Sequence, residues 1–517
     1  MSRSGVMLPA LLRTGQLDRP ENQRLETDLL YPVSFSQSST KFVFDRKGIL
    51  DSNSQIKFRV TAKKTPTAAI PNPGVFANGE MCYFPTSTGA ASAIQNAYLE
   101  IGGRRVATLQ DVGHYTTWKR HHWSNEFKEG IAIPKQGGND VFLGSQSSTY
   151  PPVAPFGTIG RFSNEYAQTA DASTAETEPK YRLTETASET FEAALSLSQL
   201  IPMLKGVLLP LFAIKQEVSL TIEWTRDKVG ERFCKSKFLS PAAGDIAVTT
   251  AIDQPSCLIM ADYLFYPDQL QALGEDIMSR GGYDLVYEEL QVAYNAENSN
   301  GARAAGSTLR TETFLPLGGK RVKSVIQQSQ YNGATGNANA YLNNVGVYNS
   351  KALVGGESMN LTIDSNPFYS IPLSNPALQF KEANAVEGIP LQLNAMLYDF
   401  TPSLDVTKAN YIQGITDRTL DGFNQDALLI ASAAAPAFDK GLAGDAGAHH
   451  WLGVKISNAA GNGVRMSNTP MIWSRTSTLI APGAMGIDDT QVKWILRYFV
   501  VTERVLNISN GIVNMIE

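Results

Sequence analysis

The segment SCLIMADYLFYPDQLQALGEDIMSRGGYDLVYEELQVAY, residues 256–294, decides the fold that we expect for this chain. It begins with an aromatic-rich run that predicts a β-strand, continues through an acidic stretch that predicts a short helix, and ends in a run that predicts a second strand. The same kind of unit opens the chain. The sequence therefore indicates one architecture that is used twice.

Length and composition bound the answer further. The chain has 517 residues, whereas a single hydrophobic core stops growing near roughly 250 to 300 residues. Hydrophobic residues make up 43% and charged residues 18% of the sequence, which is typical of a folded globular protein. Short apolar runs separated by Asn, Ser, Thr and Gly outnumber long amphipathic patterns. We therefore expect a β-rich chain of two domains with generous loops.

The charge balance argues against a protein that coats nucleic acid. The formal net charge is −5 and the isoelectric point is about 5.7, whereas such binding needs clustered Lys and Arg to displace counterions. The amino-terminal stretch has no excess of positive charge either. Its basic and acidic residues are interleaved: Arg3, Arg13, Asp18, Arg19, Glu21, Arg24, Glu26 and Asp28. We expect no direct sequence-specific binding of nucleic acid.

Cysteines and apolar segments indicate where the chain is made. Cys82, Cys234 and Cys257 form no CxxC pair and are odd in number, so we expect reduced thiols and synthesis in a cytosol or nucleus. The run from Val6 to Leu12 is too short for a secretory signal and is stopped by Arg13. Since no apolar stretch approaches the length that spans a bilayer, we expect a soluble chain.

The pattern along the chain predicts three parts. Residues 1–27 mix Pro, Gly and charge without a period and are expected to form an arm. Residues 28–245 are expected to form a first domain, interrupted by a long loop over residues 130–190, and residues 246–517 a second domain. Strands are predicted by LLYPVSFS, TKFVFDR, QIKFRVTA, AIQNAYLEI, VSLTIEW, TLRTETFLPL and KRVKSVIQQSQY, and a helix by VGHYTTWKRHHWSNEF.

Few residues are candidates for catalysis or metal binding. A helix would place His114 and His121 on one face, but His122 does not complete an i, i+4 pair, and only Asp111 and Glu126 could add ligands. We therefore expect interface histidines, not a zinc site. No Walker A, GxSxG or GxGxxG pattern is placed as those chemistries require. We expect no catalytic, metal-binding or cofactor-binding residues and no enzymatic activity.

Three weaker signals have simpler explanations. GGRR at residues 102–105 and GGKR at residues 318–321 could contact phosphate, but solvated hairpin tips are expected. Glu288 and Glu289 are adjacent in sequence, whereas a glycosidase pair must face each other across a cleft. The tyrosines and phenylalanine of the deciding segment have a spacing that suits a packed core better than a ligand shelf. These are Tyr263, Phe265, Tyr266, Tyr283 and Tyr287.

Three segments carry a resemblance to a known family. The segment ADYLFYP, the acidic stretch and YDLVYEELQ, residues 261–291, resemble the start of the second jelly roll in double jelly-roll major capsid proteins of double-stranded DNA viruses, which include large nucleocytoplasmic viruses, virophages and Polinton-like viruses. WILRYFVVTERVLNISNGIVNM, residues 494–515, resembles the closing strand of that family. LLPLFAIKQEVSLTIEW, residues 208–224, resembles the last strands of the first barrel.

This resemblance implies an all-β fold of two consecutive eight-stranded jelly-roll barrels with short helices and long inserted loops. It implies a structural protein of the virion that forms homotrimeric, pseudo-hexagonal capsomers and assembles into an icosahedral shell. The implied partners are other copies of the chain, penton and minor capsid proteins, and an inner membrane. The long loops, at residues 130–190, 331–358 and 431–449, would form towers outside the shell.

One alternative belongs to another functional class. A two-domain β-sandwich that binds or cleaves carbohydrate would share the strand-rich pattern. It would also predict export, paired acidic residues in a cleft and exposed aromatic platforms. The missing export signal argues against it, and the absence of a catalytic constellation favours a protein that acts through its shape.

Overall fold

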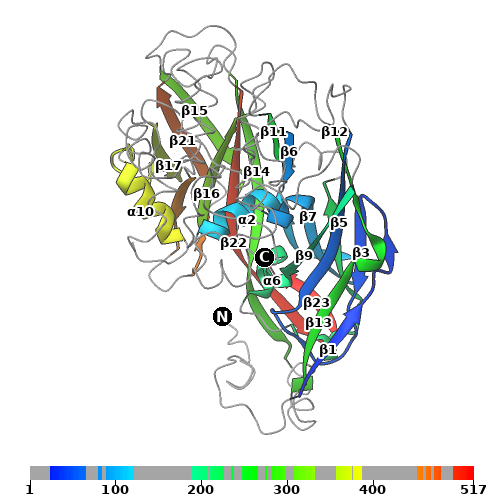
Figure 1. Cartoon of the computed structure of the whole chain (residues 1–517). Helices are drawn as coiled ribbons and strands as arrows, with labels where there is room; N and C mark the ends of the chain where they lie inside the picture. The colour runs from blue at the N-terminus through cyan, green and yellow to red at the C-terminus, as the bar shows by residue number, and fades with distance from the viewer. Residues whose placement is uncertain are drawn as a thin grey trace, which may run out of the picture.

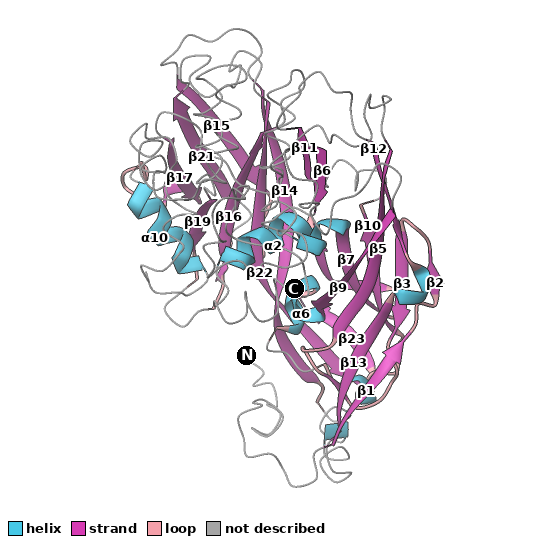
Figure 2. Ribbon diagram, in the orientation of Figure 1, coloured by secondary structure: helices cyan, strands magenta, loops and turns pink. Residues whose placement is uncertain are grey.

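The computed structural model of the chain describes residues 24–65, 80–83, 89–121, 188–205, 209–225, 234–237, 247–265, 274–275, 279, 281–298, 308–331, 357–374, 376–386, 451–457, 462–466, 471–478 and 493–516. Within these ranges the chain is mostly β-strand with a few short helices (Figure 2). The strands gather into two bodies that lie side by side, with β14 (Tyr283–Asn298) and β22 (Lys493–Ser509) between them (Figure 1).

The first body is a pair of antiparallel sheets. One sheet has the order β1-β13-β5-β12, with β4 beside β13 and β9 beside β5, and the other has the order β2-β3-β10-β7-β8. A third, two-stranded ribbon pairs β11 with β6. The strands are β1 Arg24–Leu30, β2 Ser34–Phe35, β3 Ser39–Val43, β4 Ile49–Leu50, β5 Gln55–Thr65, β6 Glu80–Tyr83, β7 Ile94–Ile101, β8 Arg104–Gln110, β9 Ser188–Ser196, β10 Val218–Trp224, β11 Cys234–Lys237, β12 Ala247–Ile252 and β13 Leu258–Phe265.

Alternation along the strands builds the core of this body. On β5, Ile56, Phe58 and Val60 are fully buried, and on β10, Leu220 and Ile222 are buried from the other sheet. Successive side chains of a strand point to opposite faces, so each strand sends every second residue inward. The rings of Phe58 and Trp224 meet across the two sheets at 5.1 Å between centroids. The two sheets therefore face each other around one apolar interior, as in a jelly roll.

The second body repeats the plan. Its sheets have the orders β14-β22-β16-β19, with β20 beside β16 and β23 beside β22, and β15-β21-β17-β18. The further strands are β15 Thr308–Leu315, β16 Arg321–Tyr331, β17 Glu357–Ile363, β18 Asn366–Pro367, β19 Trp451–Lys455, β20 Val464–Arg465, β21 Met471–Thr478 and β23 Ile512–Ile516. Its core contains Trp473 from one sheet and Tyr498 from the other, with ring centroids 5.8 Å apart.

Short helices close the sheets. They are α2 Val112–His121, α6 Leu197–Leu200 and α10 Pro376–Val386, with 3-10 turns at Gly89–Ala93, Pro202–Leu204, Leu211–Ala213 and Gln254–Ser256. Helix α10 lies against β19 at Gly453, where an added Cβ would stand 3.0 Å from the Cα of Ala383. Glycine at this strand position therefore permits the close approach of helix and sheet.

The domain boundary expected at residue 246 does not match the strand pairing. Strands β12 and β13 both lie in the sheet of β5, so residues 247–265 complete the first body, and the second begins with β14. Strand β1 starts at Arg24 and pairs with β13, so the last residues of the expected arm 1–27 belong to a strand. An apolar strand pattern predicts the strand without revealing which sheet it joins.

Most of the strands and the helix predicted from the sequence are confirmed where the structure describes them. The runs at residues 55–62, 94–101, 218–224, 308–315 and 321–331 are strands, and the run after residue 111 is a helix. The three predicted tower loops lie outside the described residues, apart from short flanking pieces such as Ser188 to Thr190, which begin β9.

Truncating a side chain between the sheets of the first body should be costly. We expect Phe58→Ala to lower the free energy of unfolding by about 3–5 kcal/mol, because it leaves a cavity in a fully buried site. The matched control is Phe314→Ala, since Phe314 is 61% exposed and should cost well under 1 kcal/mol, as surface substitutions usually do. Urea unfolding followed by circular dichroism measures both, and equal losses would contradict the two-sheet core.

Candidate functional site: the seam between the two barrels

The most distinctive site of the chain is the surface along which the two bodies meet, which we call the seam. It is formed by β14, β22 and β23 on one side and by β8, α2 and residues 209–216 of the first body on the other. Strands β14 and β22 pair without interruption from Tyr283 opposite Ile508 to Asn298 opposite Lys493. They have 16 and 17 residues, whereas strands usually have about 5–6.

Both faces of β22 are buried, each in a different core. Leu496, Tyr498 and Val500 lie in the core of the second body, whereas Phe499 and Val501, which alternate with them, lie in the core of the first. The rings of Phe499 and Tyr115 meet with centroids 5.7 Å apart. Because successive residues of one strand serve two cores, the seam is apolar and continuous with the interior of the first body.

An ion pair is buried within this apolar surface. Arg497 of β22 donates from Nε to Oδ2 of Asp111 over 2.9 Å, and the two side chains are 9% and 5% exposed. The hydroxyl of Tyr294 on β14 donates to the same oxygen, and Nε2 of Gln95 donates to Oδ1 over 2.6 Å. The guanidinium of Arg497 also lies over the ring of Tyr294. A buried carboxylate with three donors is well compensated for the water it loses.

Local structure holds Asp111 in place. It sits between β8 and α2 with φ of 50°, a left-handed conformation that Asp adopts more readily than most residues. Its backbone N–H donates to Oδ1 of Asn96, and its carbonyl accepts from the N–H of Tyr115 in α2. Since the amino end of a helix carries partial positive charge, α2 further favours an anion at this position.

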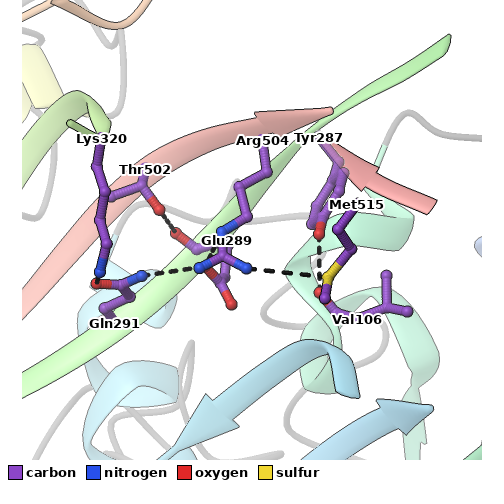
Figure 3. Close-up of polar contacts among 8 residues, drawn as sticks. All are labelled: Val106, Tyr287, Glu289, Gln291, Lys320, Thr502, Arg504 and Met515. Carbon is purple, nitrogen blue, oxygen red and sulfur yellow. Dashed lines mark hydrogen bonds and ion pairs between the residues drawn. The ribbon is translucent and has the colours of Figure 1, made fainter. Parts of the chain in front are cut away.

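A second polar group lies on the seam nearer the amino end of β14 (Figure 3). The hydroxyl of Tyr287 on β14 donates to the carbonyl of Val106 on β8 over 2.8 Å and so joins the two bodies directly. Arg504 pairs with Glu289 over 2.6 Å, and the hydroxyl of Thr502 donates to the carbonyl of Glu289. Burial, and then the nearby carboxylate of Glu289, raise the pKa of Tyr287 to about 12.

The hairpin of β22 and β23 fastens the lower end of the seam. Asn510 and Gly511 form its turn with φ of 54° and 82°, the Asn-Gly pair that two-residue hairpins favour. The backbone N–H of Lys215 donates to the carbonyl of Gly511 over 2.9 Å. The N–H of Val513 donates to Oε1 of Gln216 over 2.8 Å. These bonds tie the hairpin to the first body.

The structure describes one side chain of the predicted histidine cluster, that of His114. His114 is buried in α2, and Asp111, its expected co-ligand, is engaged by Arg497. The side chain of His121, together with His122 and Glu126, lies outside what the structure describes. In the described part of the chain, no three His, Cys, Asp or Glu residues are grouped so that they could hold a metal ion.

The first glycine-basic motif, at residues 102–105, is a hairpin tip as expected, but the second, at residues 318–321, connects β15 to β16, which lie in different sheets and do not pair. Gly102 and Gly103 form the turn between β7 and β8, both with positive φ. Arg105 pairs with Glu100 and lies over the ring of Tyr98 at 4.0 Å. In the second motif, Lys320 donates to Gln291 and Arg321 pairs with Glu503. Of the four cations in the two motifs, Arg105, Lys320 and Arg321 therefore each bind a side chain of the same chain.

The remaining candidates also resolve into structural roles. Glu288 pairs with Lys323 and is exposed, whereas Glu289 pairs with Arg504 on the seam, so the two carboxylates serve opposite faces of β14. Tyr263 and Tyr287 are buried, which confirms the prediction of core positions for these two, and Phe265 and Tyr283 are partly buried against the same core. Tyr266 lies outside the described residues. No helix in the described ranges is long and apolar enough to cross a membrane.

The architecture that these elements define is the double jelly roll: two barrels of facing antiparallel sheets, one after the other in the chain and joined along a common apolar seam. This confirms the all-β, double jelly-roll fold predicted from the sequence.

Comparison with known proteins leads to the same fold. No family model and no curated protein matches the chain. Among solved structures, it is similar to the mavirus major capsid protein, with 9% sequence identity, a TM-score of 0.50, and coverage of 97% of this chain and 92% of that one. It is also similar to a chain in the structure of the Sputnik virophage, with 10% identity, a TM-score of 0.50, and coverage of 95% and 88%. At these identities the likeness establishes the fold.

Breaking the buried ion pair should destabilise the chain far more than breaking an exposed one. We expect Arg497→Ala to lower the free energy of unfolding by about 3–5 kcal/mol, because it leaves the carboxylate of Asp111 buried without its cation. The matched control is Arg310→Ala, because the pair of Arg310 and Glu312 is 68% and 41% exposed and should contribute about 0–1 kcal/mol. A double-mutant cycle with Asp111→Ala measures the coupling, and a value near zero would refute the pair.

Alkaline pH should loosen the seam at Tyr287. Its pKa is raised above the ordinary value of 10, so the folded state favours the protonated hydroxyl. This stabilisation is complete below pH 10 and is lost as pH rises toward about 12. We expect Tyr287→Phe to flatten the fall in stability over that interval, as measured by thermal melts at stepped pH. An unchanged pH profile would contradict a buried, titrating Tyr287.

Proposed function

We propose that this chain is the major capsid protein of a double-stranded DNA virus. In this proposal it forms homotrimers with a pseudo-hexagonal outline, and these tile an icosahedral shell. The observation that carries the proposal is the seam. It makes two similarly built barrels into one unit, so three copies supply six barrels of like shape to a ring.

The physical chemistry of the chain suits tiling. Closing sheets into barrels limits the free strand edges along which chains would otherwise pair without order. A net charge of −5 on 517 residues permits dense side-by-side packing without strong mutual repulsion. The polar clusters of the seam are satisfied by partners within the chain, as at Asp111 and Glu289, and serve to hold its shape. We therefore propose a structural role without enzymatic activity.

The proposed partners follow from this role. They are other copies of the chain within the trimer, neighbouring trimers, and penton and minor capsid proteins at the vertices and beneath the shell. An inner membrane is a further proposed contact. The virion is the proposed location of the mature protein, after synthesis in the host cytoplasm or nucleus. The interleaved charges of residues 3–28 support leaving the genome to other proteins.

The mass of the purified protein in solution tests this function. We expect light scattering coupled to size-exclusion chromatography to give three times the chain mass of 56.2 kDa. Negative-stain images should show particles of hexagonal outline, because six similar barrels are arranged around the axis. A monomer that binds glycans on an array would contradict the proposal and support the carbohydrate-binding alternative.

A further inference from the structure

Two exposed apolar sheet faces are not used by the seam. The first, the β1–β13 face, consists of Leu25, Leu29, Met260 and Leu264, which lie on the outer side of the sheet in the cross-strand pairs Leu25 with Leu264 and Leu29 with Met260. Leu25, Leu29 and Met260 are 57%, 53% and 38% exposed. Tyr31 and Val33, 61% and 65% exposed, follow directly in the chain.

The second face lies on the reverse side of the seam strands. There Val286, Val505 and Ile516 form one row across β14, β22 and β23, and Ile512 lies further along β23. Val286, Ile512 and Ile516 are 55%, 51% and 47% exposed. We call these four residues the β14–β22–β23 face. Their neighbours Leu285 and Val513 point the other way, into the seam, so the alternation of the strands fixes this face outward.

Six of the fourteen large apolar side chains that are exposed in the described part of the chain lie on these two faces. A soluble monomer normally scatters such residues, whereas grouped ones mark surfaces that another molecule covers. Both groups lie on regular, paired strands, so each offers a pleated surface of defined shape. Two pleated faces of this kind can pack at about 10 Å with interdigitated side chains.

The charges around both faces decide what kind of partner fits. On the β1–β13 face, Asp262 accepts a hydrogen bond from Thr27 over 2.5 Å. On the other face, Asp284 accepts one from Asn507 over 2.5 Å, and Glu288 and Glu503 at its border are paired with Lys323 and Arg321. Covering the two faces therefore leaves each aspartate its hydrogen-bond donor and each glutamate its cation. Apolar side chains make up most of each face, so each face matches the apolar chemistry of the other.

We propose that the β1–β13 face of one copy packs against the β14–β22–β23 face of the next copy. The two faces differ in sequence and strand number, so their contact is heterologous, and a heterologous contact that closes produces a ring. The inference rests on the proposed function, which requires a ring of copies, and adds to it the surfaces that join them.

Introducing opposite charges on the two faces of one chain tests the contact. We expect Leu29→Lys and Ile516→Glu, each alone, to raise the concentration at which the oligomer dissociates by about 100-fold or more, because each places an unpaired charge in an apolar interface. The double variant L29K/I516E should regain at least about tenfold of that loss, because at every contact a lysine of one copy then lies near a glutamate of the next.

The control is Ile371→Lys, because Ile371 is 76% exposed and lies outside both faces; it should assemble like the unaltered chain. Sedimentation velocity across a dilution series measures assembly, and thermal melts of the monomers verify folding. An oligomer that persists in L29K would overturn the inference while leaving the proposed function intact. If both single variants weaken assembly and the double variant does not restore it, the proposed pairing of the two faces is wrong. That result is expected if each face instead contacts its own counterpart or residues 1–23. An unaltered chain that is monomeric would overturn both proposals.

Discussion

The structure depends on a single ribbon whose two faces are both buried. Strands β14 and β22 pair over their whole length, and β22 sends alternate residues into two different cores. Burial of apolar surface on both sides fixes the register of this ribbon, because a slip of one residue would exchange Tyr498 for Phe499 and expose Arg497 to the wrong core. The two barrels are therefore parts of one cooperative unit, not two independent domains joined by a linker.

Within this apolar seam, the cluster of Asp111, Tyr294 and Arg497 contributes specificity. A buried ion pair adds little net stability compared with well-packed apolar residues, but any arrangement that separates its partners is strongly disfavoured. The same holds for the hydrogen bond from Tyr287 to Val106, which is satisfied in only one relative placement of the barrels. Apolar burial holds the barrels together, and these polar contacts select how they sit.

Much of the fold could be predicted from the sequence because alternation is a local signal. The run of Ile56, Phe58 and Val60 predicts a half-buried strand, and it is one. The domain boundary was wrong because β13 has the same pattern whether it closes the first barrel or opens the second, and pairing with β1 and β5 over more than 190 residues of sequence leaves no local trace.

The seam was harder to foresee than the strands. Arg497 is the one charged residue in the apolar run WILRYFVV, residues 494–501, which signals a buried partner without naming it. The sequence indicates Asp111 only as a possible metal ligand beside His114, because nothing in it links Asp111 to the distant Arg497. Asn510 and Gly511 carry a recognisable turn signal, but the role of their hairpin depends on Lys215 and Gln216, which only the folded chain brings near.

The separation of β14 from β22 along the polypeptide also has a consequence for synthesis. About 200 residues lie between the end of one strand and the start of its partner. At translation rates of ~5–20 residues per second, β14 emerges from the ribosome ten seconds or more before β22 can pair with it. During that interval β14 is a long apolar strand without its partner, and it can pair with the β14 strands of other nascent chains on the same mRNA. The spacing of ribosomes along the mRNA would therefore affect the yield of correctly folded protein.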